Sequence, residues 1–203
     1  MPQGRLFVIS GPSAVGKGTI VKKIMDAPDR VSLSVSTTTR MPREGEQEGV
    51  HYYFLSDEQF RERIAYGGFL EYAEVHGHFY GTPKGPVLDK LEQGQDVILE
   101  IDVQGAMQVK KSYEYATYIF ILPPSLQELR NRIAQRGTES PEDVERRMGK
   151  ALGEIAYLEH YDYFVVNDDL ELATAMVRNI MQAQHQKIDD QAGELLEKYK
   201  GEK

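Results

Sequence analysis

Residues 11–19 read Gly11-Pro12-Ser13-Ala14-Val15-Gly16-Lys17-Gly18-Thr19 and follow a short apolar run at residues 6–9. This stretch fits the pattern G-x-x-x-x-G-K, which forms a phosphate-binding loop when it connects a strand to a helix. Its glycines let the backbone approach a polyphosphate closely, while consecutive amide groups and the helix N-terminus attract the phosphate oxygens. The stretch therefore predicts a nucleotide phosphate site, with Lys17 reaching the terminal phosphates.

Short apolar runs recur along the chain, and each is apolar on consecutive residues, which is typical of strands buried on both faces. They lie at residues 6–9, 97–101, 118–122 and 164–166. Amphipathic stretches separate them: one has an apolar stripe of Ile20, Val21, Ile24 and Met25, and another has Leu172, Met176 and Ile180. This alternation predicts an α/β fold in which helices cover both faces of a parallel sheet.

The segment from residue 33 to 84 departs from this alternation. Residues 31–39 alternate between apolar side chains and serines, which predicts one strand with a solvent-exposed face. The sequence then becomes rich in tyrosine and glycine, and residues 76–78 predict the tip of a hairpin. We interpret the segment as a mixed α+β insertion between strands of the core.

The composition narrows the range of partners. The 203 residues correspond to roughly one domain. With 24 Lys and Arg against 32 Asp and Glu, the net charge of −8 disfavours nucleic acid and anionic membranes. The chain has no cysteine, which fits a reducing compartment, and no run approaches the roughly 20 apolar residues of a membrane span. We expect a cytoplasmic protein that binds neither nucleic acid nor membrane.

An acid at a strand end is the candidate for holding a metal. Gly18 stands where the strict loop pattern has a Ser or Thr that ligates Mg²⁺, and Thr19 cannot substitute because one helical residue rotates the side chain by about 100°. The metal then needs a carboxylate as well as phosphate oxygens and water. Asp102 directly follows the run at residues 97–101, at the strand end where open α/β sheets bind ligands. We expect Asp102 to hold the metal through a water molecule. The alternative is that Asp102 is a solvated or capping group.

Several separated motifs, in order along the chain, resemble those of guanylate kinases. After the phosphate loop they are Ser36-Thr37-Thr38-Thr39-Arg40-Met41-Pro42-Arg43, Gly49-Val50-His51-Tyr52, Phe69-Leu70-Glu71, Tyr80-Gly81-Thr82, Glu100-Ile101-Asp102-Val103-Gln104-Gly105 and Val166-Asn167-Asp168-Asp169. The resemblance covers residues 4–184 and implies a three-layer P-loop nucleoside monophosphate kinase. It implies a core of residues 1–32, 85–124 and 151–203, a GMP-binding region at 33–84 and a helical lid at 125–150.

The resemblance also implies roles for individual residues. ATP would bind the loop from Gly11 to Thr19, with Asn167 near its base. GMP would be held through its phosphate by Arg40, Arg43, Tyr52 and Tyr80, and through its guanine by Ser36, Glu71, Thr82 and Glu100. The transferring phosphoryl group would be surrounded by Lys17, Arg40 and the lid residues Arg132, Arg136 and Arg147.

Elementary chemistry supports two of these assignments. Guanine presents two donors, N1–H and the 2-amino group, to one carboxylate, whereas adenine has an acceptor at N1, so a buried Glu71 would discriminate between them. Residues 126–149 contain arginine but no lysine, and the planar guanidinium suits phosphate oxygens. The alternatives are an ordinary strand acid at Glu71, packing roles for Tyr52 and Tyr80, and a solvated, ion-paired arginine surface.

The implied reaction is ATP + GMP giving ADP + GDP, with Mg²⁺ bound to ATP. It needs no general base, because the second pKa of a phosphate monoester is about 6 and the acceptor oxygen is ionised at neutral pH. The rival readings are a kinase for AMP, UMP or dTMP, a non-catalytic guanylate-kinase-like scaffold module, and a nucleotide sensor without turnover. Monomer and homo-oligomer both stay open, as does the role of the tail at residues 185–203.

Overall fold

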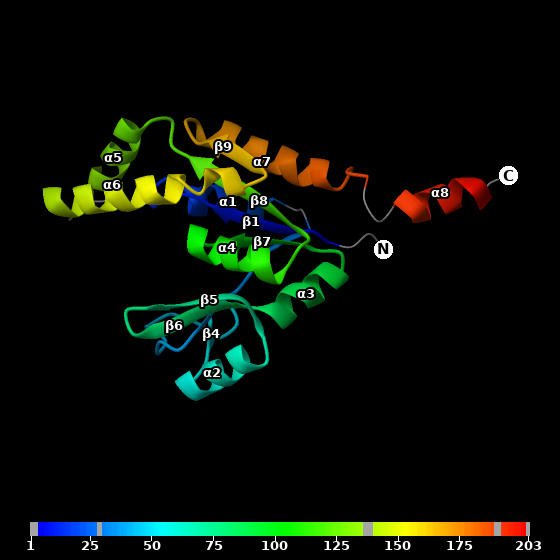
Figure 1. Ribbon diagram of the computed structural model, residues 1–203, viewed down its shortest axis with the longest axis horizontal. Helices are drawn as coiled ribbons and strands as arrows, with labels where there is room; N and C mark the ends of the chain where they lie inside the picture. The colour runs from blue at the N-terminus through cyan, green and yellow to red at the C-terminus, as the bar shows by residue number, and fades with distance from the viewer. Residues whose placement is uncertain (1–3, 28–29, 136–139, 189–191, 202–203) are drawn as a thin grey trace.

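The structure is a computed structural model that describes residues 4–27, 30–135, 140–188 and 192–201. A five-stranded parallel sheet forms the core, and a separate four-stranded sheet lies beside it (Figure 1). The core strands follow the order β2-β7-β1-β8-β9. They are β1 (Leu6–Ser10), β2 (Val31–Leu33), β7 (Asp96–Glu100), β8 (Ala116–Leu122) and β9 (Tyr163–Val166).

Helices cover both faces of the core sheet. They are α1 (Lys17–Met25), α3 (Lys84–Glu92), α4 (Val103–Ser112) and α7 (Leu170–Gln184). Phe7 and Ile9 of β1 pack with α1 and α7, whereas Leu6 and Val8 pack with α3 and α4. Because successive strand residues point to opposite faces, a strand between two helical layers is apolar throughout. The predicted α/β fold with three layers is confirmed.

The buried face of α7 agrees with the predicted stripe only at Ile180, which is partly buried against the core. Leu172 and Met176 are 64% and 53% exposed. The buried residues are instead Ala173, Val177 and Met181, which belong to the same apolar cluster as α1. Both rows have the spacing of one helix face, so spacing alone could not choose between them. The small side chain of Ala173 lets the backbone of α7 approach its neighbours closely.

The buried strand predicted at residues 164–166 is also wrong in part. β9 is an edge strand, so it has a neighbouring strand on only one side. Val165 is buried, but Phe164 is 64% exposed and Val166 is 39% exposed. Val165 points toward α7, while the opposite face at this edge is incompletely covered.

The single strand predicted at residues 31–39 is wrong, because the chain crosses there from one sheet to the other. β2 ends at Leu33, and β3 (Thr37–Thr38) pairs with the smaller sheet. That sheet has the order β4-β3-β6-β5. Its other elements are β4 (Tyr53–Phe54), β5 (Phe69–Val75), β6 (His78–Pro83) and the helix α2 (Asp57–Ala65). The segment is thus a mixed α+β unit, as expected.

The small sheet has an aromatic core of its own. Phe60 of α2 is fully buried, and its ring stacks on those of Phe69 and Phe79 with centroid distances of 4.3 and 5.3 Å. At the hairpin tip between β5 and β6, His76 and Gly77 have φ angles of +52° and +78°. Such positive angles suit a two-residue hairpin turn, which confirms the predicted tip.

Two helices, α5 (Leu126–Gln135) and α6 (Pro141–Ile155), project beyond one end of the core sheet (Figure 1). Ser140 caps α6, and Pro141 occupies its first turn. Leu129 and Ile133 of α5 pack against Met148 of α6 in one buried cluster. The pair is therefore stabilised by its own apolar interface.

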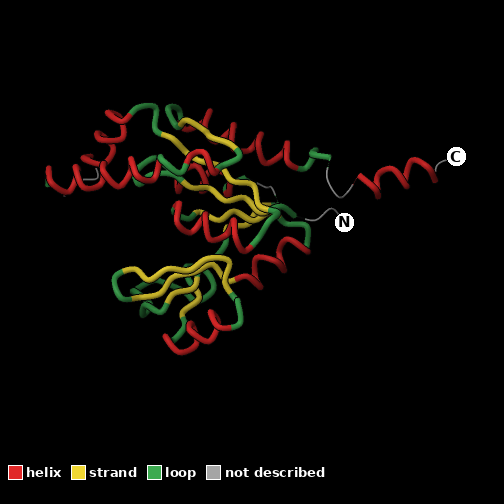
Figure 2. The backbone as a smooth tube through the Cα atoms, in the orientation of Figure 1, coloured by secondary structure: helices red, strands yellow, loops and turns green. Residues whose placement is uncertain are grey.

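The C-terminal tail does not simply extend α7. α7 ends at Gln184, and a separate helix, α8 (Ala192–Gly201), follows (Figure 2). Leu196 and Tyr199 of α8 are 60% and 66% exposed. Within the described ranges, no helix has the length and apolarity needed to cross a bilayer.

We predict that Phe60→Ala destabilises the protein by about 3–5 kcal/mol, because it leaves a cavity between two stacked rings. Unfolding in urea, followed by circular dichroism, measures this loss. The control is Tyr66→Ala, since Tyr66 is 67% exposed at the end of the same helix. Equal losses in the two variants would contradict the assigned aromatic core.

Candidate active site

The phosphate loop connects β1 to α1, as its pattern predicts, and two of its glycines are required by close contacts. A Cβ atom on Gly11 would lie 2.3 Å from the carbonyl oxygen of Ile121, and one on Gly16 would lie 2.4 Å from Nδ2 of Asn167. Both glycines also have positive φ angles, +146° and +96°. The loop therefore lies directly against β8 and the residue that follows β9.

Lys17 begins α1, and its ammonium group lies against the loop. Nζ donates hydrogen bonds to the carbonyl oxygens of Gly11 and Pro12, over 2.6 and 3.0 Å. The lysine is thus at the end of the loop where a bound polyphosphate would need a cation.

Ala14 links the loop to the two projecting helices. Its φ angle of +66° is in the left-handed region, which costs a residue with a Cβ atom about 1–2 kcal/mol. Its side chain belongs to the buried cluster of α5 and α6, together with Leu129 and Met148. Alanine here provides a methyl group that glycine would lack, so the loop and these helices share an apolar contact.

The Asn167 side chain is hydrogen-bonded to the backbone of the phosphate loop. Its Nδ2 donates to the carbonyl oxygen of Val15 over 2.8 Å, and the residue is only 6% exposed. The carbonyl oxygen of Asn167 accepts from Nη1 of Arg132 over 3.1 Å, and Nε of Arg132 donates to Glu128 over 2.8 Å. In this arrangement Asn167 positions the loop; its contact with the ATP base stays a prediction.

The structure separates the described arginines of α5 and α6 into two groups. Arg132 contacts Asn167, and Nη2 of Arg147 donates to Oγ of Ser13 in the loop over 2.7 Å. Arg130 instead pairs with Glu145, and Arg146 pairs with Asp143. The first group faces the phosphate loop, and the second forms a surface of ion pairs. Arg136 lies outside the described residues.

A cavity of about 150 Å³ lies between the two sheets. Four of the residues predicted to bind GMP line it, namely Ser36, Tyr52, Thr82 and Glu100. They come from four segments distant in the sequence. The fold thus brings together residues that the sequence only lists in order.

Glu71, on β5, lies next to this cavity. Its Oε1 accepts a hydrogen bond of 2.6 Å from Oγ1 of Thr82. Burial raises the pKa of Glu71, although the Thr82 hydroxyl opposes this shift. A Cβ atom on Gly105 would lie 3.1 Å from Oε2 of Glu71, so the glycine leaves room for the carboxylate at the start of α4. Sequence reasoning assigned Gly105 no role, although it ends one of the quoted motifs.

Arg40 and Arg43 share a partner that sequence reasoning missed. The Glu46 carboxylate accepts from Nη2 of Arg40 over 2.9 Å and from the backbone amide of Arg43 over 2.8 Å. The guanidinium carbon of Arg40 lies 5.5 Å from the centre of the Tyr52 ring, which in turn contacts Tyr80. These contacts place all four predicted ligands of the GMP phosphate in one neighbourhood. The only sequence signal for Glu46 was its place in the same loop.

Two carboxylates lie at the C-terminal end of β7: Glu100 is its last residue, and Asp102 precedes α4. A Cβ atom on Gly18 would lie 3.4 Å from Oε1 of Glu100, so Glu100 faces the position that a hydroxyl occupies in the strict pattern. Burial raises the pKa of Glu100, and the charge of Lys17 opposes this shift. Oδ1 of Asp102 accepts from the backbone amide of Gly105 over 2.9 Å and thereby caps α4.

These acids fit Mg²⁺, which is commonly bound by one or two carboxylates together with substrate phosphates and water. No set of three or more His, Cys, Asp or Glu side chains in the described part of the chain forms a metal-binding group by itself. A metal here would therefore depend on the nucleotide phosphates. The function of Asp102 toward the metal stays a prediction.

The phosphate loop lies at the end of a parallel sheet, near the cavity between the two sheets. This arrangement defines a P-loop nucleotide-binding α/β protein. The family model described as guanylate kinase matches residues 3–184. The chain is 46% identical to a guanylate kinase of Clostridioides difficile over 98% of both chains. It is 50% identical to one of Caldanaerobacter subterraneus over 92% of this chain and 91% of that relative.

A solved structure of a guanylate kinase is also similar to this chain in fold and sequence. The crystal structure of guanylate kinase from Anaplasma phagocytophilum superposes with a TM-score of 0.73 at 36% identity, covering 97% of this chain and 95% of that one. The chain therefore belongs to the guanylate kinase family.

We predict that Glu71→Gln stabilises the ligand-free protein more at pH 7 than at pH 4.5. A carboxyl group whose pKa is raised in the folded state loses stabilisation as the pH rises past its unfolded pKa, and glutamine avoids this loss. Urea unfolding of both proteins at the two pH values measures the difference. Glu74→Gln is the control, on the exposed part of β5. An equal effect of Glu71→Gln at both pH values would refute the assigned burial cost.

Proposed function

We propose that the protein is an ATP:GMP phosphotransferase, which transfers the γ-phosphoryl group of ATP to GMP and gives ADP and GDP. One observation carries the proposal: Glu100 lines the cavity between the sheets and also faces Gly18 of the phosphate loop. An acceptor in that cavity would therefore lie beside the triphosphate of a donor on the loop. The family of the chain supports the same reaction.

The acceptor phosphate needs orientation rather than a base. Its oxygen is largely ionised at neutral pH, so no side chain has to remove a proton. We assign Arg40, Arg43, Tyr52 and Tyr80 to holding this phosphate. The Glu46 carboxylate keeps the guanidinium of Arg40 in place. Arg40 therefore loses less side-chain conformational entropy when the acceptor phosphate binds. Positioning two anions in line is the main task in phosphoryl transfer.

The guanine base would bind beside Glu71. Its N1–H and 2-amino groups can donate to the two carboxylate oxygens, while Thr82 keeps Oε1 oriented. Ser36 and Glu100 border the same cavity and would contact other edges of the base. Adenine would direct a lone pair at the carboxylate, so the proposal includes a preference for GMP over AMP.

The donor phosphates would bind the amide groups of the loop and the ammonium group of Lys17. Arg147 and Arg132 already contact the loop and Asn167, so a small movement of α5 and α6 would bring them to the transferred group. We assign residues 125–150 as the lid, which includes Arg136, and residues 33–84 as the GMP-binding region. Closure of both would exclude water, which otherwise competes as acceptor.

Mg²⁺ would be held by Asp102 through water, near Glu100, together with oxygens of ATP. The ion supplies positive charge at the triphosphate when it is bound. The absence of cysteine and the acidic composition support a cytoplasmic location, where neither nucleic acid nor membrane is a partner.

We predict that Lys17→Ala lowers kcat by about 10²–10³-fold, because one preorganised cation at the transferred group is lost. The dissociation constant of GMP should stay within about twofold, since Lys17 serves the donor site. Chromatography after incubation with ATP, Mg²⁺ and GMP measures ADP and GDP. Lys22→Ala is the control, because Lys22 is exposed on the same helix. If wild-type protein forms no GDP, the proposed function is wrong.

We also predict that Glu71→Gln reduces the ratio of kcat/KM for GMP to that for AMP by at least about tenfold. A glutamine places an amide donor against one guanine donor, whereas it offers adenine a hydrogen bond. Parallel assays with GMP, AMP, UMP and dTMP measure the ratio, with Glu74→Gln as control. An unaltered ratio would remove Glu71 from base recognition.

A further inference from the structure

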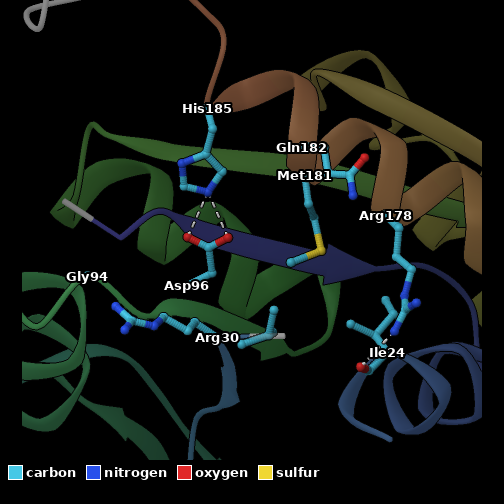
Figure 3. A pocket seen from close by; sticks show the side chains of 9 residues that line it. Ile24, Arg30, Gly94, Asp96, Arg178, Met181, Gln182 and His185 are labelled. Carbon is cyan, nitrogen blue, oxygen red and sulfur yellow. Dashed lines mark hydrogen bonds and ion pairs between the residues drawn. The ribbon is translucent and has the colours of Figure 1, made fainter. Parts of the chain in front are cut away.

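A second cavity, of about 260 Å³, lies at the end of the core sheet opposite the phosphate loop (Figure 3). It is bordered by the first residues of β2 and β7, the end of α1 and the last turns of α7. Ile24 in its wall is separated from Lys17 by about 10 Å along α1. No residue that we assign to ATP, GMP or Mg²⁺ lines this cavity.

The polar part of the cavity favours an anion. Among the described residues, Asp96 is the one acidic side chain that lines it, and its carboxylate already has hydrogen-bond partners. It accepts from the backbone amide of Arg5 over 2.8 Å and lies 2.8 and 3.0 Å from Nε2 of His185. Arg30 and Arg178 bring two positive charges, against the one negative charge of Asp96. This wall is therefore cationic in a protein whose net charge is −8.

The two arginines differ in what they can do for a ligand. Arg178 donates to the carbonyl oxygen of Ile24 over 3.2 Å, which fixes it at the end of α1. Arg30 is exposed and lines the cavity, and no carboxylate among the described residues forms an ion pair with it. Because guanidinium groups bind carboxylates and phosphates through paired hydrogen bonds, Arg30 is the group best placed to receive one.

The remaining lining residues are Gly94, Gln182 and three apolar residues. Ile24 is fully buried and Met181 is 4% exposed, so the half-buried Val31 supplies the accessible apolar surface. Figure 3 shows the Met181 side chain between Arg30 and Arg178. The volume is just below the range of about 300–1,000 Å³ typical of small-molecule sites, which suits a compact ligand.

We propose that this cavity is a second ligand site, which binds a small organic anion through Arg30. The ligand has one carboxylate or phosphate group, which pairs with the guanidinium, and a compact body, which lies beside Val31 in the cavity. This site is distinct from the proposed phosphotransfer centre. It requires no turnover, so its test does not depend on the proposed function.

The test uses three probes that share a phenyl ring: benzoate, phenyl phosphate and the neutral benzyl alcohol. They are titrated into nitrogen-15-labelled protein containing excess ADP and GMP, while the amide resonances of Gly94, Val31 and Gly16 are followed. We expect one or both anions to shift Gly94 and Val31 saturably without shifting Gly16 in the phosphate loop. The anion that binds more tightly identifies carboxylate or phosphate as the preferred group. Shifts only at Gly16, or equal binding of benzyl alcohol, would overturn the proposal.

Two variants locate the anion-binding group. Arg30→Gln should weaken binding of the preferred anion by about tenfold, the value of one charge-assisted contact. Lys22→Gln removes one positive charge from the exposed face of α1 without altering the cavity lining. It should change the dissociation constant of the anion by less than about twofold. A matching amide spectrum and unfolding midpoint confirm that Arg30→Gln is folded. If folded Arg30→Gln binds the anion as tightly as wild type, the proposed site is wrong.

Discussion

The nucleotide end of the core depends on backbone contacts that are too close for any side chain. Gly11 lies directly against the carbonyl group of Ile121, and Gly16 lies against the amide group of Asn167. These contacts let β8 and the residue after β9 determine the path of the phosphate loop. Only along that path do the amide groups of the loop point toward a common position for a polyphosphate. The geometry of the proposed donor site therefore depends on how the loop packs against the sheet.

A similar constraint joins the small sheet to the core. Glu71 on β5 reaches toward α4 at a point where Gly105 leaves space for its carboxylate, and Asp102 caps the same helix. The carboxylate that would read the acceptor base is therefore positioned by elements of both sheets. Glu100 extends this relation to the phosphate loop at Gly18. The proposed donor and acceptor sites thus meet at Glu100, which suits a reaction that must hold two anions close together.

The order of the core elements could be predicted from the sequence, because it depends on local patterns, while the roles of the candidate site residues stay predictions. The phosphate loop has a fixed spacing, and β1 is apolar throughout because it lies between two helical layers. The errors concern long-range choices. Leu172 and Met176 have helical spacing, yet Ala173 and Val177 are buried, because the shape of the neighbouring layer selects the face that packs. Phe164 is exposed because β9 is at the sheet edge, and strand order is not encoded locally.

The α/β class, the phosphate loop and the family resemblance follow from the sequence alone, since each depends on residue types at short, regular spacing. Which side chains meet became visible only in the folded structure. It revealed Glu46 as the partner of Arg40, Gly105 as the space beside Glu71, and the cationic cavity at Arg30. These relations join residues through close packing in three dimensions, and packing depends on the whole chain rather than on any neighbouring stretch.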